Sequence, residues 1–124
     1  MFDEVWKRLV RRRYAKLEAR LPGYKKLDVK GELYPGLVKS KNSCVDGIVY
    51  LKIKNKDLLL LDKYEGKYYQ RTPVLVCIRG SETIRADVYV FKKKYKNLLA
   101  KSEWDADKFR TKNLYRFLST YPAL

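Results

Sequence analysis

The stretch Leu58–Arg71 decides the fold of this chain, and it reads LLLLDKYEGKYYQR. Four leucines are followed by a charged segment, a glycine and paired tyrosines. Because glycine readily adopts the left-handed conformation that ends helices, we predict a short buried helix that opens near Asp57 and stops at Gly66. The residues that follow, Tyr69–Arg79, include the alternating and β-branched side chains that are typical of a strand.

Glu65 lies at the predicted junction between this helix and this strand. A carboxylate there faces the negative end of the helix dipole and loses water to apolar and phenolic neighbours. Both effects raise the pKa of Glu65, which is what a general base working near neutral pH requires. The alternative interpretation is a structural helix-end carboxylate that pairs with Lys67 or Arg71.

Length and composition limit the class of protein. A chain of 124 residues fits a single domain, 1–124, with one core. A hydrophobic content of 46% is too high for a disordered basic tail. No apolar run approaches the ~20 residues of a membrane helix, and the first residues lack the pattern of a signal peptide. We therefore expect a cytoplasmic protein with no membrane partner.

Histidine is absent from the chain. This excludes Ser-His-Asp and Cys-His catalysis and the common zinc sites, so acid–base chemistry must come from carboxylates, lysines or tyrosines. The two cysteines, Cys44 and Cys77, are too far apart in the sequence to indicate a metal site. Both lie in apolar, strand-like segments, and we predict buried free thiols.

The net charge is +15, and it includes the basic runs Arg11–Arg13 and Lys92–Lys94. Such a charge attracts polyanions and favours non-specific binding of nucleic acid at low salt. However, the runs are separated and flank predicted strands. A solvated, lysine-rich surface is therefore the favoured interpretation, and a nucleic-acid interface is the alternative.

The remaining periodicities predict an α+β fold, a small mixed β-barrel or curled sheet flanked by short helices. Gly47 is a candidate for a bulge or for a close approach between chains. The predicted elements are helices at roughly 2–10 and 105–120; strands at 15–21, 24–30, 37–38, 44–53, 69–79 and 83–91; and turns at 22–23, 39–43 and 80–82.

The order of these elements resembles the γ-glutamylcyclotransferase-like superfamily. The closest likeness is to the branch that contains the plant avirulence-induced-gene proteins and bacterial γ-glutamylamine cyclotransferase-like proteins. Six segments in the same order carry the resemblance: 19–24, ARLPGY; 31–36, GELYPG; 45–47, VDG; 61–71, LDKYEGKYYQR; 86–90, ADVYV; and 103–105, EWD.

The resemblance implies a chemistry without metal or cofactor. The α-amino group of a small γ-glutamyl compound attacks its own side-chain carbonyl, 5-oxoproline forms, and an amine leaves. Carried over, the general acid and base is Glu65. If the protein is such an enzyme, we expect Tyr34, Tyr69 and Tyr89 to line the substrate pocket; the alternative for each tyrosine is packing or a place on the surface. Arg71 is expected to brace the surroundings of Glu65 or a strand.

In one feature the sequence departs from the family pattern. Members open with a strand that ends in Tyr-Gly-Thr-Leu or Tyr-Gly-Ser-Leu, whose loop amides hold the glutamyl carboxylate and the developing oxyanion. This chain lacks such a run, and Met1–Val5 resembles the segment that follows it. Either the chain was started too late or the strand is missing. A missing core strand would expose sheet edges that can pair with another chain.

A second function remains open beside the enzymatic one. A non-catalytic binding domain on the same scaffold would use its basic surface to recognise nucleic acid or an acidic partner. Against this, the sequence contains no recognised nucleic-acid-binding motif. The identity of the leaving amine and the oligomeric state do not follow from the sequence.

Overall fold

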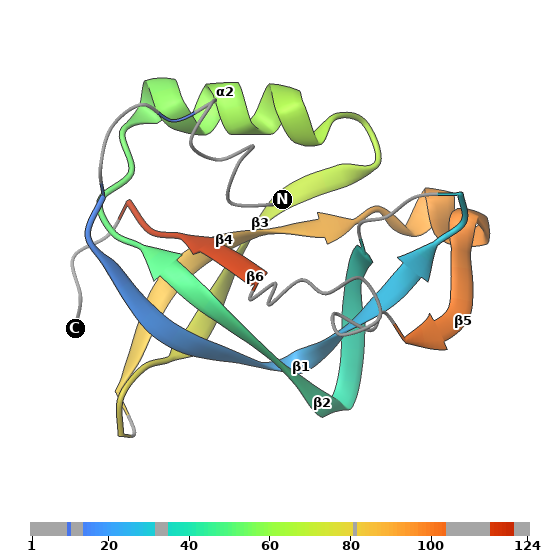
Figure 1. The fold of residues 1–124 in the computed structure, drawn as a ribbon, viewed down its shortest axis with the longest axis horizontal. Coiled ribbons are helices and arrows are strands. Elements are labelled where there is room, and N and C mark those ends of the chain that lie inside the picture. Colours follow the sequence, from blue (N-terminus) through green and yellow to red (C-terminus); the bar gives the residue numbers. More distant parts are fainter. Residues whose placement is uncertain (1–9, 11–13, 32–34, 81, 104–114, 121–124) are drawn as a thin grey trace.

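The computed structural model describes residues 10, 14–31, 35–80, 82–103 and 115–120 (Figure 1). The predicted helix at 2–10 lies almost entirely outside these residues. In chain order the described elements are the strands β1 (Lys16–Val29) and β2 (Pro35–Tyr50), the helix α2 (Asn55–Glu65), the strands β3 (Tyr69–Cys77) and β4 (Thr83–Phe91), the 3₁₀ helix η1 (Lys93–Leu98), and the strands β5 (Leu99–Glu103) and β6 (Tyr115–Leu118).

The described strands form a mixed barrel. The sheet order is β2-β6-β4-β3-β1-β5, and an additional β1–β2 pairing joins the sheet into a closed ring, with β5 attached to β1 outside it. The β2–β6 pair is parallel and the other pairs are antiparallel. Helix α2 lies across one side of the barrel, at the top of Figure 1. The predicted fold class, a small mixed barrel with short helices, is confirmed.

The prediction was wrong about the first strands. The two strands predicted at 15–21 and 24–30 are one long strand, β1, and the turn predicted at Pro22-Gly23 is a bulge inside it. Gly23 has φ +82°, a conformation that glycine adopts without strain. The polar segment 39–43 is likewise part of β2 rather than a hairpin turn. The two strands bend together and stay paired through the bend, so local turn residues mark a corner and not an end.

The C-terminal helix predicted over 105–120 is wrong for the residues that the structure describes. Residues 104–114 lie outside them, but Tyr115–Leu118 form strand β6. This strand pairs along β2 from Gly47 to Tyr50 and also pairs with β4 where Asp87 faces Leu118. Aromatic and apolar residues at helical spacing satisfy a strand equally well once a long-range partner is present. Strand β6 therefore lies between β2 and β4 and pairs with both.

Helix α2 agrees with the prediction at its end and differs from it in burial. It runs from Asn55 and stops before Gly66, whose φ is +78°. Leu58 and Leu61 are buried, whereas Leu59 and Leu60 are 67% and 46% exposed. The four-leucine run therefore buries one face only, as expected for a helix that covers a barrel. None of the described helices is long and apolar enough to cross a membrane.

Two clusters of buried side chains form the core. One contains Val45, Val49, Val76, Val88 and Phe117 and fills the barrel. The other contains Leu58, Leu61, Tyr69, Tyr89 and Phe91, which join α2 to the outer face of β3 and β4. The prediction of buried cysteines was wrong: Cys44 is exposed and Cys77 is partly exposed. The side chains of both lie beside Arg20 of β1, at the rim of the barrel.

Gly47 is a point of close approach, as predicted. A Cβ atom placed there would lie 2.2 Å from the Tyr115 carbonyl oxygen and 2.4 Å from the Phe117 ring. Because the backbone oxygen belongs to the paired strand, it cannot move without breaking the β2–β6 pairing. Glycine is thus required for the closure of the barrel.

We expect Gly47→Ala to lower the free energy of unfolding by about 1–3 kcal/mol, because the added methyl group overpacks the β2–β6 seam. Denaturant unfolding measures the change. The control is Lys39→Ala at an exposed position of the same strand, which should change it by less than about 0.5 kcal/mol. A Gly47→Ala protein as stable as this control would contradict the tight seam.

Candidate active site

Glu65 ends helix α2 and is only partly exposed. The Gly66 amide donates to the Asp62 carbonyl oxygen at 3.2 Å, which closes the last turn and carries the chain towards β3. Burial raises the pKa of the Glu65 carboxyl, while the nearby Arg116 guanidinium acts in the opposite direction and lowers it. The direction of the shift agrees with the prediction from sequence. Among the described residues, no ion pair joins Glu65 to Lys67 or Arg71, so the alternative pairing is not found.

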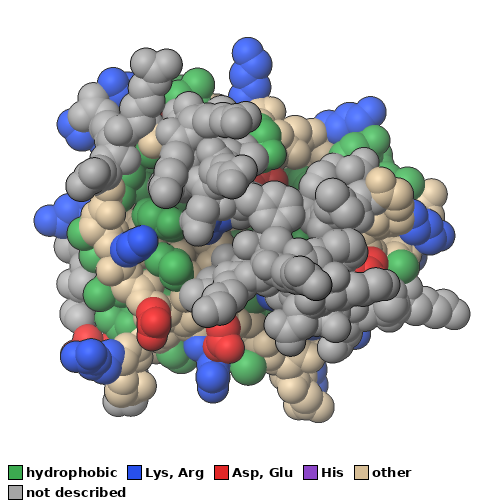
Figure 2. Space-filling model, in the orientation of Figure 1, with side chains coloured by type: hydrophobic (Ala, Val, Ile, Leu, Met, Phe, Trp, Pro, Cys, Tyr) green, Lys and Arg blue, Asp and Glu red, His purple; other side chains and the backbone are tan. Residues whose placement is uncertain are grey.

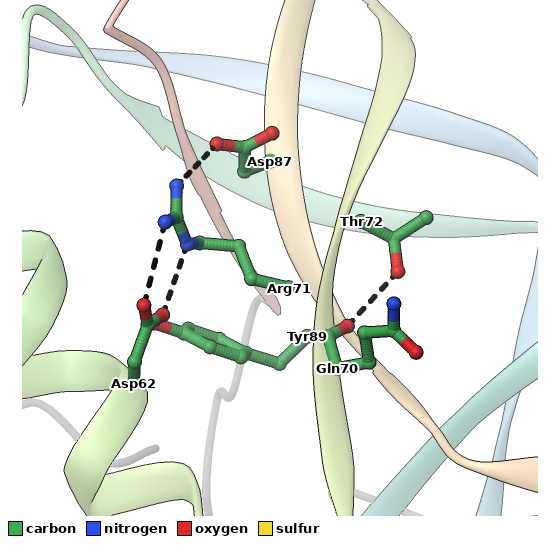
Figure 3. Close-up of polar contacts among 6 residues, drawn as sticks. All are labelled: Asp62, Gln70, Arg71, Thr72, Asp87 and Tyr89. Carbon is green, nitrogen blue, oxygen red and sulfur yellow. Dashed lines mark hydrogen bonds and ion pairs between the residues drawn. The ribbon is translucent and has the colours of Figure 1, made fainter.

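Arg71 of β3 is the centre of a polar cluster beneath the helix (Figure 3). Its Nε donates to Asp62 Oδ1 at 2.9 Å and its Nη2 donates to Asp62 Oδ2 at 3.3 Å. The third nitrogen, Nη1, donates to Asp87 Oδ2 of β4 at 2.9 Å. The Tyr89 hydroxyl adds a 2.6 Å hydrogen bond to Asp62 Oδ1. Planar two-point pairing of this kind fixes orientation as well as distance.

This cluster positions Glu65. Asp62 and Glu65 are three residues apart on α2, so their side chains lie on neighbouring parts of one helix face. By holding Asp62 against β3 and β4, Arg71 sets the angle and depth of the last helical turn. The predicted role of Arg71 as a brace agrees with this geometry. In the matching segment 61–71, Asp62 and Arg71 therefore form an ion pair. We infer that this pair orients the Glu65 carboxylate.

Three tyrosines surround this end of the helix. Tyr69 is buried, and its hydroxyl donates to the Pro35 carbonyl oxygen at 2.9 Å. Tyr89 is buried and bonded to Asp62. The Tyr115 hydroxyl of β6 donates to the Tyr89 carbonyl oxygen at 3.4 Å. Burial is the main cause that raises the pKa of both Tyr89 and Tyr115, and the negative charge of Glu65 adds to it in each case. These phenols therefore stay protonated and act as neutral hydrogen-bonding groups.

Of the predicted site residues, Tyr89 lies near enough to Glu65 for the carboxylate charge to raise the pKa of Tyr89, and Tyr69 is buried with Tyr89 in one core cluster. Their role in lining a substrate pocket stays a prediction. Tyr34, the other predicted lining residue, lies outside the described residues. Sequence reasoning missed Asp87, Tyr115 and Arg116. The last two belong to β6, and no local pattern indicated that this strand would lie beside the helix end. The Asp in ADVYV was noted as part of a matching segment but without a role.

Among the described residues, the Lys and Arg side chains do not gather into one patch on the face shown in Figure 2. Lys and Arg side chains are distributed around the outline of this face. This distribution agrees with the solvated, lysine-rich surface favoured from sequence. Within the described part of the chain, no group of three or more Cys, Asp or Glu side chains is arranged to hold a metal ion.

We expect Arg71→Met to lower the free energy of unfolding by about 2 kcal/mol, because it leaves the partly buried Asp62 and Asp87 carboxylates without their shared cation. Arg71→Lys should recover less than half of this, since an ammonium cannot reproduce the planar fork. Denaturant unfolding at constant salt measures both.

A matched control exists in the other Arg–Asp pair, Arg20 Nε to Asp46 Oδ1 at 3.0 Å, whose side chains are 63% exposed. Arg20→Met should unfold at nearly the same denaturant concentration as the natural protein, because exposed ion pairs contribute little. Equal destabilisation by the two Arg substitutions would contradict a special role for Arg71.

Comparisons with known proteins identify the family of this chain. The family model for "Gamma-glutamyl cyclotransferase, AIG2-like" matches residues 1–106. AIG2-like protein B of Arabidopsis thaliana is 31% identical over 106 residues, 85% of this chain and 61% of that protein. AIG2-like protein D of the same plant is 30% identical over 120 residues, 95% of this chain and 78% of that protein. The chain thus spans between about three fifths and four fifths of the length of these relatives.

Two solved structures have the same fold. A solution structure of an Arabidopsis thaliana protein superimposes with a TM-score of 0.68 at 26% identity, covering 86% of this chain and 72% of that one. A second, also from Arabidopsis thaliana, gives a TM-score of 0.65 at 28% identity, covering 86% and 65%. Together with the sequence match and the mixed barrel, these comparisons show that the chain belongs to the AIG2-like γ-glutamyl cyclotransferase family.

Proposed function

We propose that this protein is a γ-glutamyl cyclotransferase that uses Glu65 as its general acid and base. The observation that carries the proposal is the environment of Glu65. Its carboxyl lies at the end of α2, partly withdrawn from water, with a raised pKa and with protonated phenols beside it. A carboxylate with a raised pKa accepts a proton more readily than an ordinary carboxylate and can return it.

The reaction is intramolecular and needs a single proton carrier. Glu65 removes a proton from the α-ammonium group of the substrate, and the amine nitrogen attacks the γ-carbonyl carbon to form a five-membered ring. The protonated Glu65 then donates to the departing nitrogen as the old carbon–nitrogen bond breaks. The ring nitrogen loses its second proton through Glu65 to the released amine, which leaves as an ammonium ion. The products are 5-oxoproline and an amine, and Glu65 returns to its initial charge. Holding the glutamyl chain bent supplies much of the rate.

The surrounding residues have distinct roles in this proposal. Tyr69 and Tyr89 form a wall with their hydroxyls already bonded to protein oxygens, so they shape the pocket rather than exchange protons. Tyr34 completes the lining in the proposal. Arg116, whose charge acts on Glu65, is the cation that we assign to pairing with the carboxylate of the glutamyl group.

We expect Glu65→Gln to lower the rate of 5-oxoproline release from a γ-glutamyl amine by about 10²–10⁴-fold, because the amide cannot accept the proton. The rate is measured by chromatographic detection of 5-oxoproline. The control is Glu82→Gln, which removes an exposed carboxylate between β3 and β4 and should leave the rate unchanged.

Stability separates loss of chemistry from loss of fold in this experiment. The folded-state pKa of Glu65 is raised, so ionisation of this carboxyl costs stability as the pH rises towards and through that pKa. Glu65→Gln should therefore be at least as stable as the natural protein at neutral pH. A full rate in a folded Glu65→Gln protein would remove Glu65 from the mechanism.

The pH profile tests the electrostatic environment of the base. Activity needs ionised Glu65, so kcat/KM should rise with pH through the raised pKa of Glu65 and then level off. Arg116→Gln removes a positive charge that lowers this pKa, and the rising limb should move to higher pH. Arg116→Lys should keep most of the original position. A limb that does not move, or moves to lower pH, would show that Arg116 does not act on the base.

A further inference from the structure

A hollow lies away from Glu65, where β4 runs into η1. It has a volume of about 490 Å³ and is lined by Gln70, Thr72, Val90, Phe91, Lys92, Lys93 and Lys94. This volume is within the range of small-molecule sites in proteins, roughly 300–1,000 Å³. Neutral polar groups, an apolar wall and three adjacent cations therefore share one concave surface.

Apart from Phe91, the β3 and β4 residues that line the hollow are on the opposite face of the hairpin from Arg71 and Tyr89. Gln70 pairs with Val90, and Arg71 pairs with Tyr89 at the next position. Because side chains alternate along a strand, Gln70, Thr72 and Val90 point away from the side that carries Arg71 and Tyr89. Figure 3 shows Gln70 and Thr72 on the other side of β3 from the Asp62–Arg71 pair. The Gln70, Thr72 and Val90 side chains of the hollow are thus separate from the polar cluster around Arg71.

The backbone around the three lysines is anchored. The Lys92 amide donates to the Tyr68 carbonyl oxygen at 2.8 Å, and the Tyr95 amide donates to the Lys92 carbonyl oxygen at 3.0 Å. The Tyr68 ring packs edge-on against the Tyr95 ring with centroids 4.8 Å apart. Lysines on a backbone held in this way lose less freedom on binding a ligand than lysines on a loose loop.

Three lysines give the hollow its positive charge. Within the described ranges, no carboxylate forms an ion pair with Lys92, Lys93 or Lys94. Lys94 Nζ lies 5.2 Å from the centre of the Tyr95 ring, a contact that leaves its hydrogens available to an anion. The overall charge of +15 adds to the local attraction.

We propose that this hollow binds a small phosphorylated metabolite that carries at least two phosphate charges. Compact ammonium groups pair well with phosphate oxygens, and three of them exceed what a single carboxylate needs. Gln70 and Thr72 supply neutral hydrogen-bonding groups for a sugar or other hydroxyl-bearing part, and Val90 supplies an apolar wall. The volume of about 490 Å³ matches a small ligand, whereas a nucleic-acid strand is bound along an extended groove. The proposal is independent of the activity proposed for Glu65.

The test is isothermal titration calorimetry of the full chain with ADP, pyrophosphate and inorganic phosphate at about physiological ionic strength. ADP and pyrophosphate should bind at least about tenfold more tightly than phosphate, because each further charge-assisted hydrogen bond contributes roughly a factor of ten. The triple variant Lys92→Gln, Lys93→Gln, Lys94→Gln should lose at least that factor for both ligands.

The control removes the same net charge elsewhere. Lys16, Lys54 and Lys56 are exposed and lie outside the hollow, and their triple replacement by Gln should change affinity by less than about twofold. Equal weakening by the two triple variants would overturn the proposal in favour of a general charge effect. The proposal also predicts that the double variant Gln70→Ala, Thr72→Val lowers the affinity for ADP more than the affinity for pyrophosphate.

A nucleic-acid strand is the competing ligand. Titration with a short single-stranded DNA distinguishes it, since DNA binding to a general basic surface should fall steeply with added salt and respond to both triple variants. Tight DNA binding that depends on Lys92–Lys94, combined with no detectable binding of ADP or pyrophosphate, would overturn the proposal.

Discussion

The Arg71 guanidinium is the contact on which the arrangement of helix and barrel depends. It joins α2, through Asp62, to β4, through Asp87, while lying itself on β3. Three elements thus share one cation with three directed hydrogen bonds. Apolar packing alone would permit α2 to slide over the barrel, because burial of leucines is not directional. The planar pairing removes that freedom and so determines where the helix ends relative to the tyrosines of β3, β4 and β6.

Closure of the barrel is the second requirement. Strand β6 is four residues long, yet it pairs with both β2 and β4 and buries Phe117 and Leu118 in the two clusters of the core. Its hydrogen bonds continue beyond the strand, because the Ser119 amide donates to the Tyr50 carbonyl oxygen and the Ile53 amide donates to the Ser119 carbonyl oxygen, both at 2.8 Å. The same strand carries Tyr115 and Arg116 to the end of α2. A single segment therefore closes the barrel and contributes to the electrostatics of Glu65.

The β3–β4 hairpin separates two chemical environments. Its outer face under α2 contains Arg71, Asp87 and Tyr89, where charges are paired and water is partly excluded. Gln70 and Thr72 face the other way, towards lysines that form no ion pair with any carboxylate in the described part of the chain. The strand period of two makes this possible, since neighbouring residues serve opposite sides of the sheet. Acid–base chemistry is proposed for the first environment and anion binding for the second.

The sequence by itself determined the local features. Gly66 predicted the end of α2, the segment from Gly80 predicted the turn of a hairpin, and the position of Glu65 after an apolar run predicted a raised pKa. These succeed because helix ends, tight turns and desolvation by near neighbours depend on residues close in the chain.

Only the tertiary structure decided the long-range features. Whether Pro22-Gly23 and the segment 39–43 end a strand or bend it depended on continued pairing between β1 and β2. Whether Tyr115–Leu118 forms a helix or a strand depended on pairing with β2. Gly47, which pairs with Tyr115, is more than 60 residues earlier in the chain. The shared bonding of Asp62 and Asp87 to Arg71 likewise required three elements to meet. Such contacts join residues that no local pattern relates, because non-local pairing is selected by the whole core and not by intrinsic propensity.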